Sequence, residues 1–212
     1  MSPVPSGTVQ AAYRQAFVLH CFELIRLAHR DLDTTSLHNA EEPHITGELV
    51  RQARTILESP DAVHWMRFLA IHDDPPQNQP GVYGKRRRRL DVEFEVTGQQ
   101  PRPRFHIEAK RLYRQDSVNE YFGDGGLLLF VTGQYAPDWP SAGMLGYIQS
   151  EDESTWHSRL AAGLAARTGK LRVCAETEGW ESFAPALNRT CHQRGEVALG
   201  RIDIFHCLLT VI

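Results

Sequence analysis

The sequence predicts an α/β fold, with helices on the faces of a central mixed β-sheet. Residues 91–96 and 105–110 alternate polar and apolar side chains with a period of two, which is typical of half-buried strands. Apolar residues recur at helical spacing in residues 9–30 and 152–167. Residues 202–212 are almost continuously apolar, as in a buried strand. Helical and strand segments therefore occur together along the whole chain.

After the helix of residues 9–30, the amino-terminal part is predicted to contain a second helix, a short helix and a strand. The second helix is expected to begin at Thr46, a residue type that caps helices, and to run to about Glu58. The short helix is expected to begin at Asp61. Residues 67–72 are predicted to be a strand, because they are largely apolar and an Asp-Asp-Pro-Pro turn follows them.

The two alternating segments are predicted to form an antiparallel hairpin, because Gly98 and the prolines at 101 and 103 interrupt the chain between them. The alternation divides their side chains between two faces of the sheet. One face would carry Asp91, Glu93, Glu95, His106, Glu108 and Lys110; the other would carry Val92, Phe94, Val96, Phe105, Ile107 and Ala109.

The carboxyl-terminal half continues the α/β pattern. Two short helices are expected within residues 112–131, and a strand at residues 144–149 precedes the helix of residues 152–167. Residues 183–192 form a candidate strand, although Pro185 argues against a central place in the sheet.

Charge is strongly segregated along the chain. The formal net charge is −3, but residues 85–114 contain ten Lys or Arg and four acids, so this segment carries +6 and the remainder −9. Five consecutive basic residues, Lys85, Arg86, Arg87, Arg88 and Arg89, begin the segment. Adjacent cations repel one another, which favours an anionic partner and predicts contact with nucleic acid. The alternative is a solvated, charged loop.

Cysteine usage and the terminal sequence predict a cytoplasmic protein. Cys21, Cys174, Cys191 and Cys207 form no CxxC pair, and they are expected to be reduced core thiols. The first ten residues lack the basic and apolar regions of a signal peptide, and no apolar run reaches the length of a membrane span.

Asp91 followed by Glu108-Ala109-Lys110 resembles the D…(D/E)xK signature of the PD-(D/E)xK nucleases, the restriction-endonuclease-like superfamily. The resemblance covers about residues 45–150 and implies a single nuclease domain over residues 1–212, with the helix of residues 9–30 before its core. Residues 151–212 would be a carboxyl-terminal α/β extension. The family's proline before the first acid is replaced by Leu90.

The resemblance also implies a metal site. Hard divalent cations prefer oxygen ligands, and Asp91, Glu108 and the carbonyl of Ala109 would hold Mg²⁺, with Mn²⁺ as a substitute. In this family an upstream helix often adds a carboxylate, and Glu48 is the predicted one. Lys110 would orient or deprotonate the attacking water, or hold a non-bridging phosphate oxygen.

Each of these residues also has an interpretation without a catalytic role. Asp91 and Glu108 are alternatively solvent-facing strand acids. Glu93 and Glu95 are expected to lie outside the metal's ligands or to be exposed, and His106 to be a surface or packing residue.

The function expected from these features is Mg²⁺-dependent hydrolysis of DNA. Phosphate contacts from Lys85 to Arg89 and from Arg111 would supply affinity without sequence specificity. The resemblance suggests the effector of a prokaryotic restriction or anti-phage defence system, in which a partner protein or a homodimer supplies specificity or activation. The alternatives are a catalytically inactive nucleic-acid-binding or scaffold subunit, and a nuclease directed at RNA.

Overall fold

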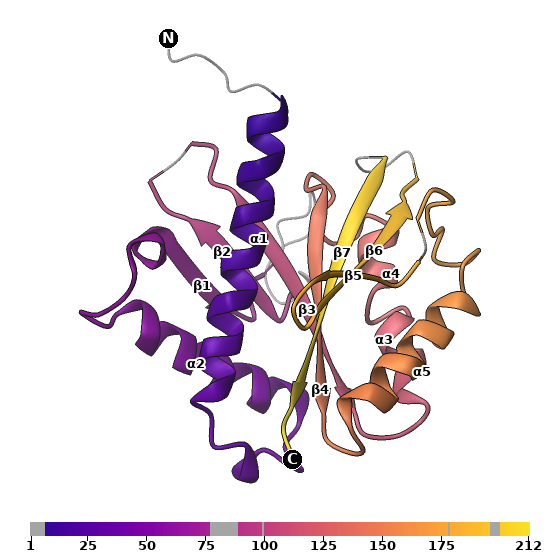
Figure 1. Cartoon of the computed structure of the whole chain (residues 1–212), viewed down its shortest axis with the longest axis horizontal. Helices are drawn as coiled ribbons and strands as arrows, with labels where there is room; N and C mark the ends of the chain where they lie inside the picture. The colour runs from indigo at the N-terminus through magenta and orange to yellow at the C-terminus, as the bar shows by residue number, and fades with distance from the viewer. Residues whose placement is uncertain (1–6, 77–88, 99, 178, 196–199) are drawn as a thin grey trace.

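The computed structural model describes residues 7–76, 89–98, 100–177, 179–195 and 200–212. These residues form five α-helices, two short 3-10 helices and seven strands (Figure 1). In chain order the elements are α1 (Gly7–Arg30), η1 (Thr34–Ser36), α2 (Glu42–Leu57), η2 (His64–Phe68), β1 (Leu69–Asp73), β2 (Val92–Val96), β3 (Arg104–Leu112), α3 (Ser117–Phe122), α4 (Leu128–Val131), β4 (Ser141–Ile148), α5 (Glu153–Ala165), β5 (Glu181–Ala184), β6 (Leu187–Gln193) and β7 (Arg201–Thr210).

The strands form one mixed sheet in the order β1-β2-β3-β4-β7-β6-β5. Strands β3, β4 and β7 are parallel neighbours, and the outer pairs are antiparallel. The predicted α/β class with a central mixed sheet is confirmed. Residues 151–212, predicted as an extension of the core, contribute β7 to the interior of the same sheet, where it pairs with β4.

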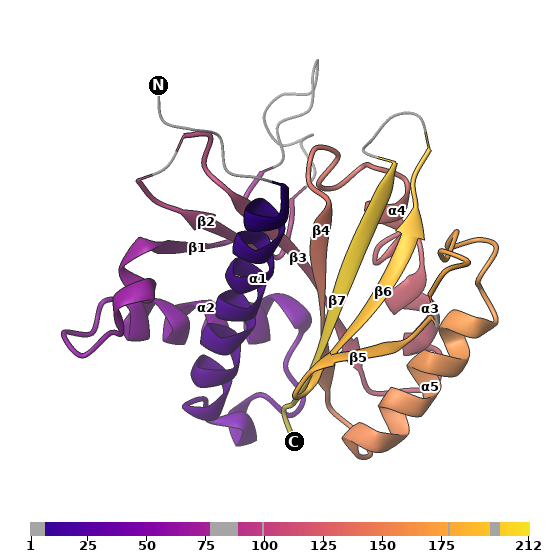
Figure 2. The same ribbon diagram turned by 45° about the horizontal axis from the view of Figure 1, so that its top comes forward.

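Helices cover both faces of the sheet (Figure 2), and a hydrophobic core lies under each helical layer. Helices α1 and α2 pack on the face that contains Phe94, Phe105 and Ile107. Helices α3, α4 and α5 pack on the face that contains Met144 and Ile204. The apolar half of the predicted alternation therefore faces α1 and α2, as burial of a period-two stripe requires.

The predicted hairpin is confirmed. Strands β2 and β3 pair antiparallel, with Val92 opposite Ile107 and Glu93 opposite His106. One step further in this register brings Asp91, directly before β2, beside Glu108. Strand β3 is in turn parallel to β4, with Lys110 opposite Gly146.

Several predicted boundaries move. Helix α2 begins at Glu42, before the expected Thr46, with Pro43 in its first turn. Thr46 is not a cap: it is buried inside the helix and hydrogen-bonds the Tyr147 hydroxyl at 3.0 Å. The short helix expected from Asp61 is the 3-10 helix η2.

The segment expected as one strand at residues 183–192 is a hairpin of two strands. Pro185 lies between β5 and β6, and Ala186 beside it has a positive φ of 55°. Strand β5 is at the sheet edge. The proline that argued against a central strand instead marks the turn.

The expectation of four reduced cysteines is wrong for one pair. Cys174 and Cys191 form a disulfide across 17 residues of sequence, whereas Cys21 and Cys207 are free and buried. Among the described residues, none of the helices combines the length and the apolar character needed to cross a membrane.

Candidate active site

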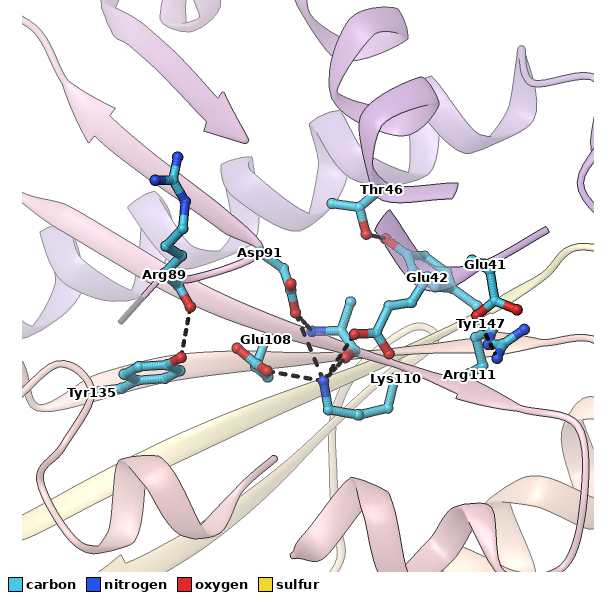
Figure 3. Close-up of polar contacts among 11 residues, drawn as sticks. Glu41, Glu42, Thr46, Arg89, Asp91, Glu108, Lys110, Arg111, Tyr135 and Tyr147 are labelled. Carbon is cyan, nitrogen blue, oxygen red and sulfur yellow. Dashed lines mark hydrogen bonds and ion pairs between the residues drawn. The ribbon is translucent and has the colours of Figure 1, made fainter. Parts of the chain in front are cut away.

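Asp91, Glu108 and Lys110 come together where the β2–β3 hairpin opens (Figure 3). Asp91 precedes β2 and the other two lie in β3. The pairing of β2 with β3 brings Asp91 beside Glu108, and the period of two puts Lys110 on the same side of the strand as Glu108.

Four oxygen-bearing groups surround the ammonium of Lys110. Its Nζ donates to Glu108 Oε1 at 2.9 Å, to Glu42 Oε1 at 3.0 Å and to the carbonyl oxygen of Ala109 at 2.5 Å. Asp91 Oδ2 lies 4.0 Å from the same nitrogen. These groups are therefore arranged to neutralise one cation.

Asp91 is held by the backbone of the neighbouring strand. Its Oδ2 accepts a hydrogen bond of 2.6 Å from the Ala109 N–H. Burial raises the pKa of Asp91, and the positive charge of Lys110 opposes this rise. The carboxyl is thus fixed in position through its Oδ2.

Glu108 is the most perturbed acid of the site. Burial and the charge of Asp91 raise the pKa of Glu108 to about 8, although Lys110 acts in the opposite direction. Its Oε2 is buried and accepts no hydrogen bond from the described residues. Asp91 and Glu108 are thus two neighbouring, largely buried carboxyls whose negative charges disfavour one another, and a divalent cation would relieve that repulsion.

Lys110 remains an ammonium. Burial alone would lower the pKa of Lys110, but the charges of Glu108, Glu42 and Asp91 outweigh it and raise the pKa. Of its predicted roles, deprotonating a water is therefore disfavoured in this arrangement. Holding a phosphate oxygen or orienting a water is compatible with a permanent positive charge.

The helix carboxylate at the site is Glu42, not the predicted Glu48. Both residues belong to α2, but Glu48 forms an exposed ion pair with Arg51 at 2.7 Å. Glu48 follows Glu42 by six residues, so at 3.6 residues per turn the two side chains point in directions about 240° apart around the helix axis. Pro43, a residue type favoured in a first helical turn, was the available signal that the helix begins at Glu42.

Glu93, Glu95 and His106 form a separate ion-pair network along the same sheet face. His106 Nε2 lies 2.8 Å from Glu93 Oε2, and Glu95 pairs with Arg102 at 2.5 Å and Arg104 at 3.3 Å. All three residues are buried, so that of the two positions expected for His106, surface or packing, the packing position applies, and Glu93 and Glu95 are not exposed.

The described cations near the site already have anionic partners. Arg89 pairs with Asp74 at 2.6 Å, and Arg111 pairs with Glu41 at 2.7 Å. The carbonyl of Arg89 also accepts a hydrogen bond from the Tyr135 hydroxyl, which holds the chain just before Asp91 (Figure 3). The remaining predicted nucleic-acid contacts, Lys85 to Arg88, lie outside the described residues.

The site opens to solvent through a depression of about 430 Å³ between the start of α2 and α3. Glu42 and Lys110 form one side, and Asn119, Glu120 and Asp124 form the other. Of the residues of the site, Glu42 and Lys110 line the depression, and its rim is acidic. An anionic substrate would therefore need a cation at the site to offset this charge.

The donor atoms of the site suit a hard divalent cation. Asp91 and Glu108 supply carboxylate oxygens, and Ala109 supplies a carbonyl oxygen. Within the described parts of the chain, no three His, Cys, Asp or Glu side chains are already grouped as a metal site. The main-chain carbonyl of Ala109 would be the third direct ligand of the metal ion. Glu42, which is hydrogen-bonded to Lys110, would lie outside the direct ligands.

Comparison with protein-family models, curated proteins and solved structures finds no match to this chain. The chemistry of the site is therefore the basis on which its function is inferred.

Proposed function

We propose that this protein is a Mg²⁺-dependent nuclease that hydrolyses phosphodiester bonds, with DNA as its substrate. The observation that carries the proposal is that Asp91, Glu108 and the Ala109 carbonyl surround one cation, which in this structure is the Lys110 ammonium. The buried Oε2 of Glu108 faces no donor among the described residues, and it is the oxygen that a metal ion could use while Oε1 stays bonded to Lys110.

Each residue would have a distinct part in the reaction. Asp91, Glu108 and the Ala109 carbonyl would hold the cation, and Glu42 would orient Lys110 or a water at its edge. The cation would supply charge neutralisation of the phosphate and a more acidic water. Lys110 would keep its proton and bind a non-bridging phosphate oxygen, which stabilises the extra charge of the transition state.

The placement of these residues in the fold supports a restriction-endonuclease-like core. The first acid stands at the start of one hairpin strand, the Glu-Ala-Lys tripeptide lies in its partner, and an upstream helix contributes a carboxylate. These are the positions that the resemblance implied, with Glu42 in place of Glu48. On the same ground we propose a role in restriction or anti-phage defence, with a partner or homodimer supplying activation.

Cleavage assays test the proposal. Plasmid, linear duplex, single-stranded DNA and RNA would be incubated with Mg²⁺, Mn²⁺ or EDTA. Wild type is expected to cut DNA with either metal, and Asp91→Asn and Lys110→Met to lose at least about 100-fold in rate. Asp61→Asn, at an exposed turn, is the matched control for a lost carboxylate.

The outcomes separate the alternatives. Cleavage of RNA alone would redirect the proposal to RNA. DNA binding without cleavage under any metal would favour the scaffold subunit. Full activity in both Asp91→Asn and Lys110→Met would show that the site lies elsewhere.

A further inference from the structure

The position of Glu42 depends on the segment that leads into α2. Glu42 is the first residue of the helix, and the side chain of the preceding Glu41 makes no capping hydrogen bond to it. An uncapped helix start is free to fray unless other contacts hold it. Those contacts come mainly from the carboxyl-terminal end of strand β4.

Gln149 directly follows β4 and is buried. Its Nε2 donates to the carbonyl oxygens of Leu37 at 3.1 Å and Ala40 at 2.9 Å. Its backbone N–H donates to the Leu112 carbonyl at the end of β3 at 2.9 Å. One residue thus joins the strand that carries Lys110 to the segment that carries Glu42.

Two neighbouring contacts strengthen this connection. The Tyr147 hydroxyl, two residues before Gln149 and on the same sheet face, hydrogen-bonds Thr46 one turn into α2 (Figure 3). Arg111, beside Lys110, pairs with Glu41 at 2.7 Å. The first turn of α2 and the segment before it are therefore held from both β3 and β4, and Gln149 supplies two of these contacts.

A buried glutamine would be destabilising at this position if its only role were to fill space. A buried amide must be hydrogen-bonded, and its removal takes the side-chain donor from the Leu37 and Ala40 carbonyls, which keep only the Ala40 N–H and the more distant Arg111 guanidinium as partners. An apolar residue would fill the space but could not bind the Leu37 and Ala40 carbonyls. The specific consequence of the amide is the location of the residues that follow Ala40.

We propose that Gln149 is a positioning residue of the active site, whose buried amide holds the segment before α2 so that Glu42 contacts Lys110. The inference rests on the proposed function for its catalytic meaning. The contact it predicts, however, exists in the protein without metal or substrate, and it can be measured there.

Lysine resonances provide that measurement. The chain contains three lysines, Lys85, Lys110 and Lys170. In protein labelled with ¹³C,¹⁵N-lysine, the Lys110 signals are assigned by their loss in Lys110→Arg. Glu42→Gln is expected to shift the Lys110 Cε and Nζ signals at fixed pH. Gln149→Leu is expected to shift them in the same direction, with little further change in the double variant.

Two variants guard against a trivial result. Tyr147→Phe removes the hydroxyl that binds Thr46 and should shift Lys110 in the same direction by less, so it serves if Gln149→Leu does not fold. Thr190→Val removes a buried hydroxyl that bonds His192 and His206, away from α2, and should leave Lys110 unchanged. Lys170 should be unchanged in all variants.

The proposal is overturned if a folded Gln149→Leu keeps the wild-type Lys110 signals, if its shift adds fully to that of Glu42→Gln, or if Thr190→Val shifts Lys110 equally. It is also overturned if Glu42→Gln itself has no effect. A second readout is Mn²⁺ affinity, which Gln149→Leu should lower about tenfold in wild type and less than about twofold in Glu42→Gln. A wild type that binds no Mn²⁺ would contradict the proposed function, while the lysine shifts still decide the role of Gln149.

Discussion

Glu42 and Glu48 offer a matched test within one helix. Both are glutamates of α2, but only Glu42 contacts Lys110, whereas Glu48 pairs with the exposed Arg51. Glu42→Gln removes one negative charge and preserves the size and hydrogen-bonding shape of the side chain. Glu48→Gln makes the same chemical change 6 positions further along α2.

The expected effect of Glu42→Gln follows from distance and burial. Glu42 lies 3.0 Å from the Lys110 ammonium, and a charge about 4 Å from a second one is worth about 4 kcal/mol at an effective dielectric constant of about 20. Burial, which raises the pKa of Glu42, cancels part of this energy. If about 1–2 kcal/mol remain in the transition state, the rate of cleavage falls about 5- to 30-fold.

The assay is plasmid nicking at saturating Mg²⁺, with thermal unfolding of each variant as a control for folding. Glu42→Gln should be slower by that factor, and Glu48→Gln should lie within about twofold of wild type, because exposed ion pairs contribute little. An equal reduction in rate for both variants, or a reduction confined to Glu48→Gln, would refute the assignment of Glu42 to the site.

Three further predictions concern pH, redox state and the basic run. A cation must displace the proton of Glu108, because the pKa of this carboxyl is about 8. The affinity for Mn²⁺ should therefore rise about tenfold per pH unit below pH 8 and level off above it. An affinity that stays constant between pH 6 and 8, measured by calorimetry, would contradict this prediction. Replacement of Cys174 and Cys191 by Ala removes a disulfide between residues 17 positions apart, and it should lower the free energy of unfolding by about 3 kcal/mol. Urea titration measures this change. Equal urea midpoints for wild type and variant would argue that the disulfide does not form. Replacement of Arg86 to Arg89 by Ala should weaken DNA binding and flatten its salt dependence by about 0.9 in log–log slope for each phosphate that the variant no longer neutralises; an unchanged slope would place the DNA-binding surface elsewhere.

Local periodicity was sufficient to predict the part of the site that lies on the hairpin. The alternation around Phe94 and Ile107 determines which residues are buried under α1. The residues in the alternate positions, which include Asp91, Glu108 and Lys110, are therefore predicted to lie together on the other face of the sheet. Distant parts of the chain do not enter this prediction, because the two strands are neighbours in sequence and their pairing is set by the turn between them.

The fourth residue of the site could not be predicted in the same way. Interpreting Thr46 as a cap placed the start of α2 too late and made Glu48 the natural acid of its first turn. Thr46 instead hydrogen-bonds Tyr147, about one hundred positions away in sequence, and this interaction is invisible to a local pattern. Pro43 was the better boundary signal.

The disulfide and the division of residues 183–192 into two strands were missed for different reasons. Cysteine connectivity does not follow from spacing, and Cys174 meets Cys191 because Val173 bridges to His192 in the folded chain. Pro185 is incompatible with a central strand, as predicted, but a turn between two short strands satisfies that constraint as well as a single edge strand does.

Direct titration of the protein with Mn²⁺, followed by the electron paramagnetic resonance signal of the free ion, tests the central claim that Asp91 and Glu108 form a divalent-cation site. Wild type at pH 8 should remove Mn²⁺ from solution, and Asp91→Asn and Glu108→Gln should each weaken that binding at least about tenfold. Unbound Mn²⁺ in the presence of wild type, or undiminished binding by both variants, would contradict the claim.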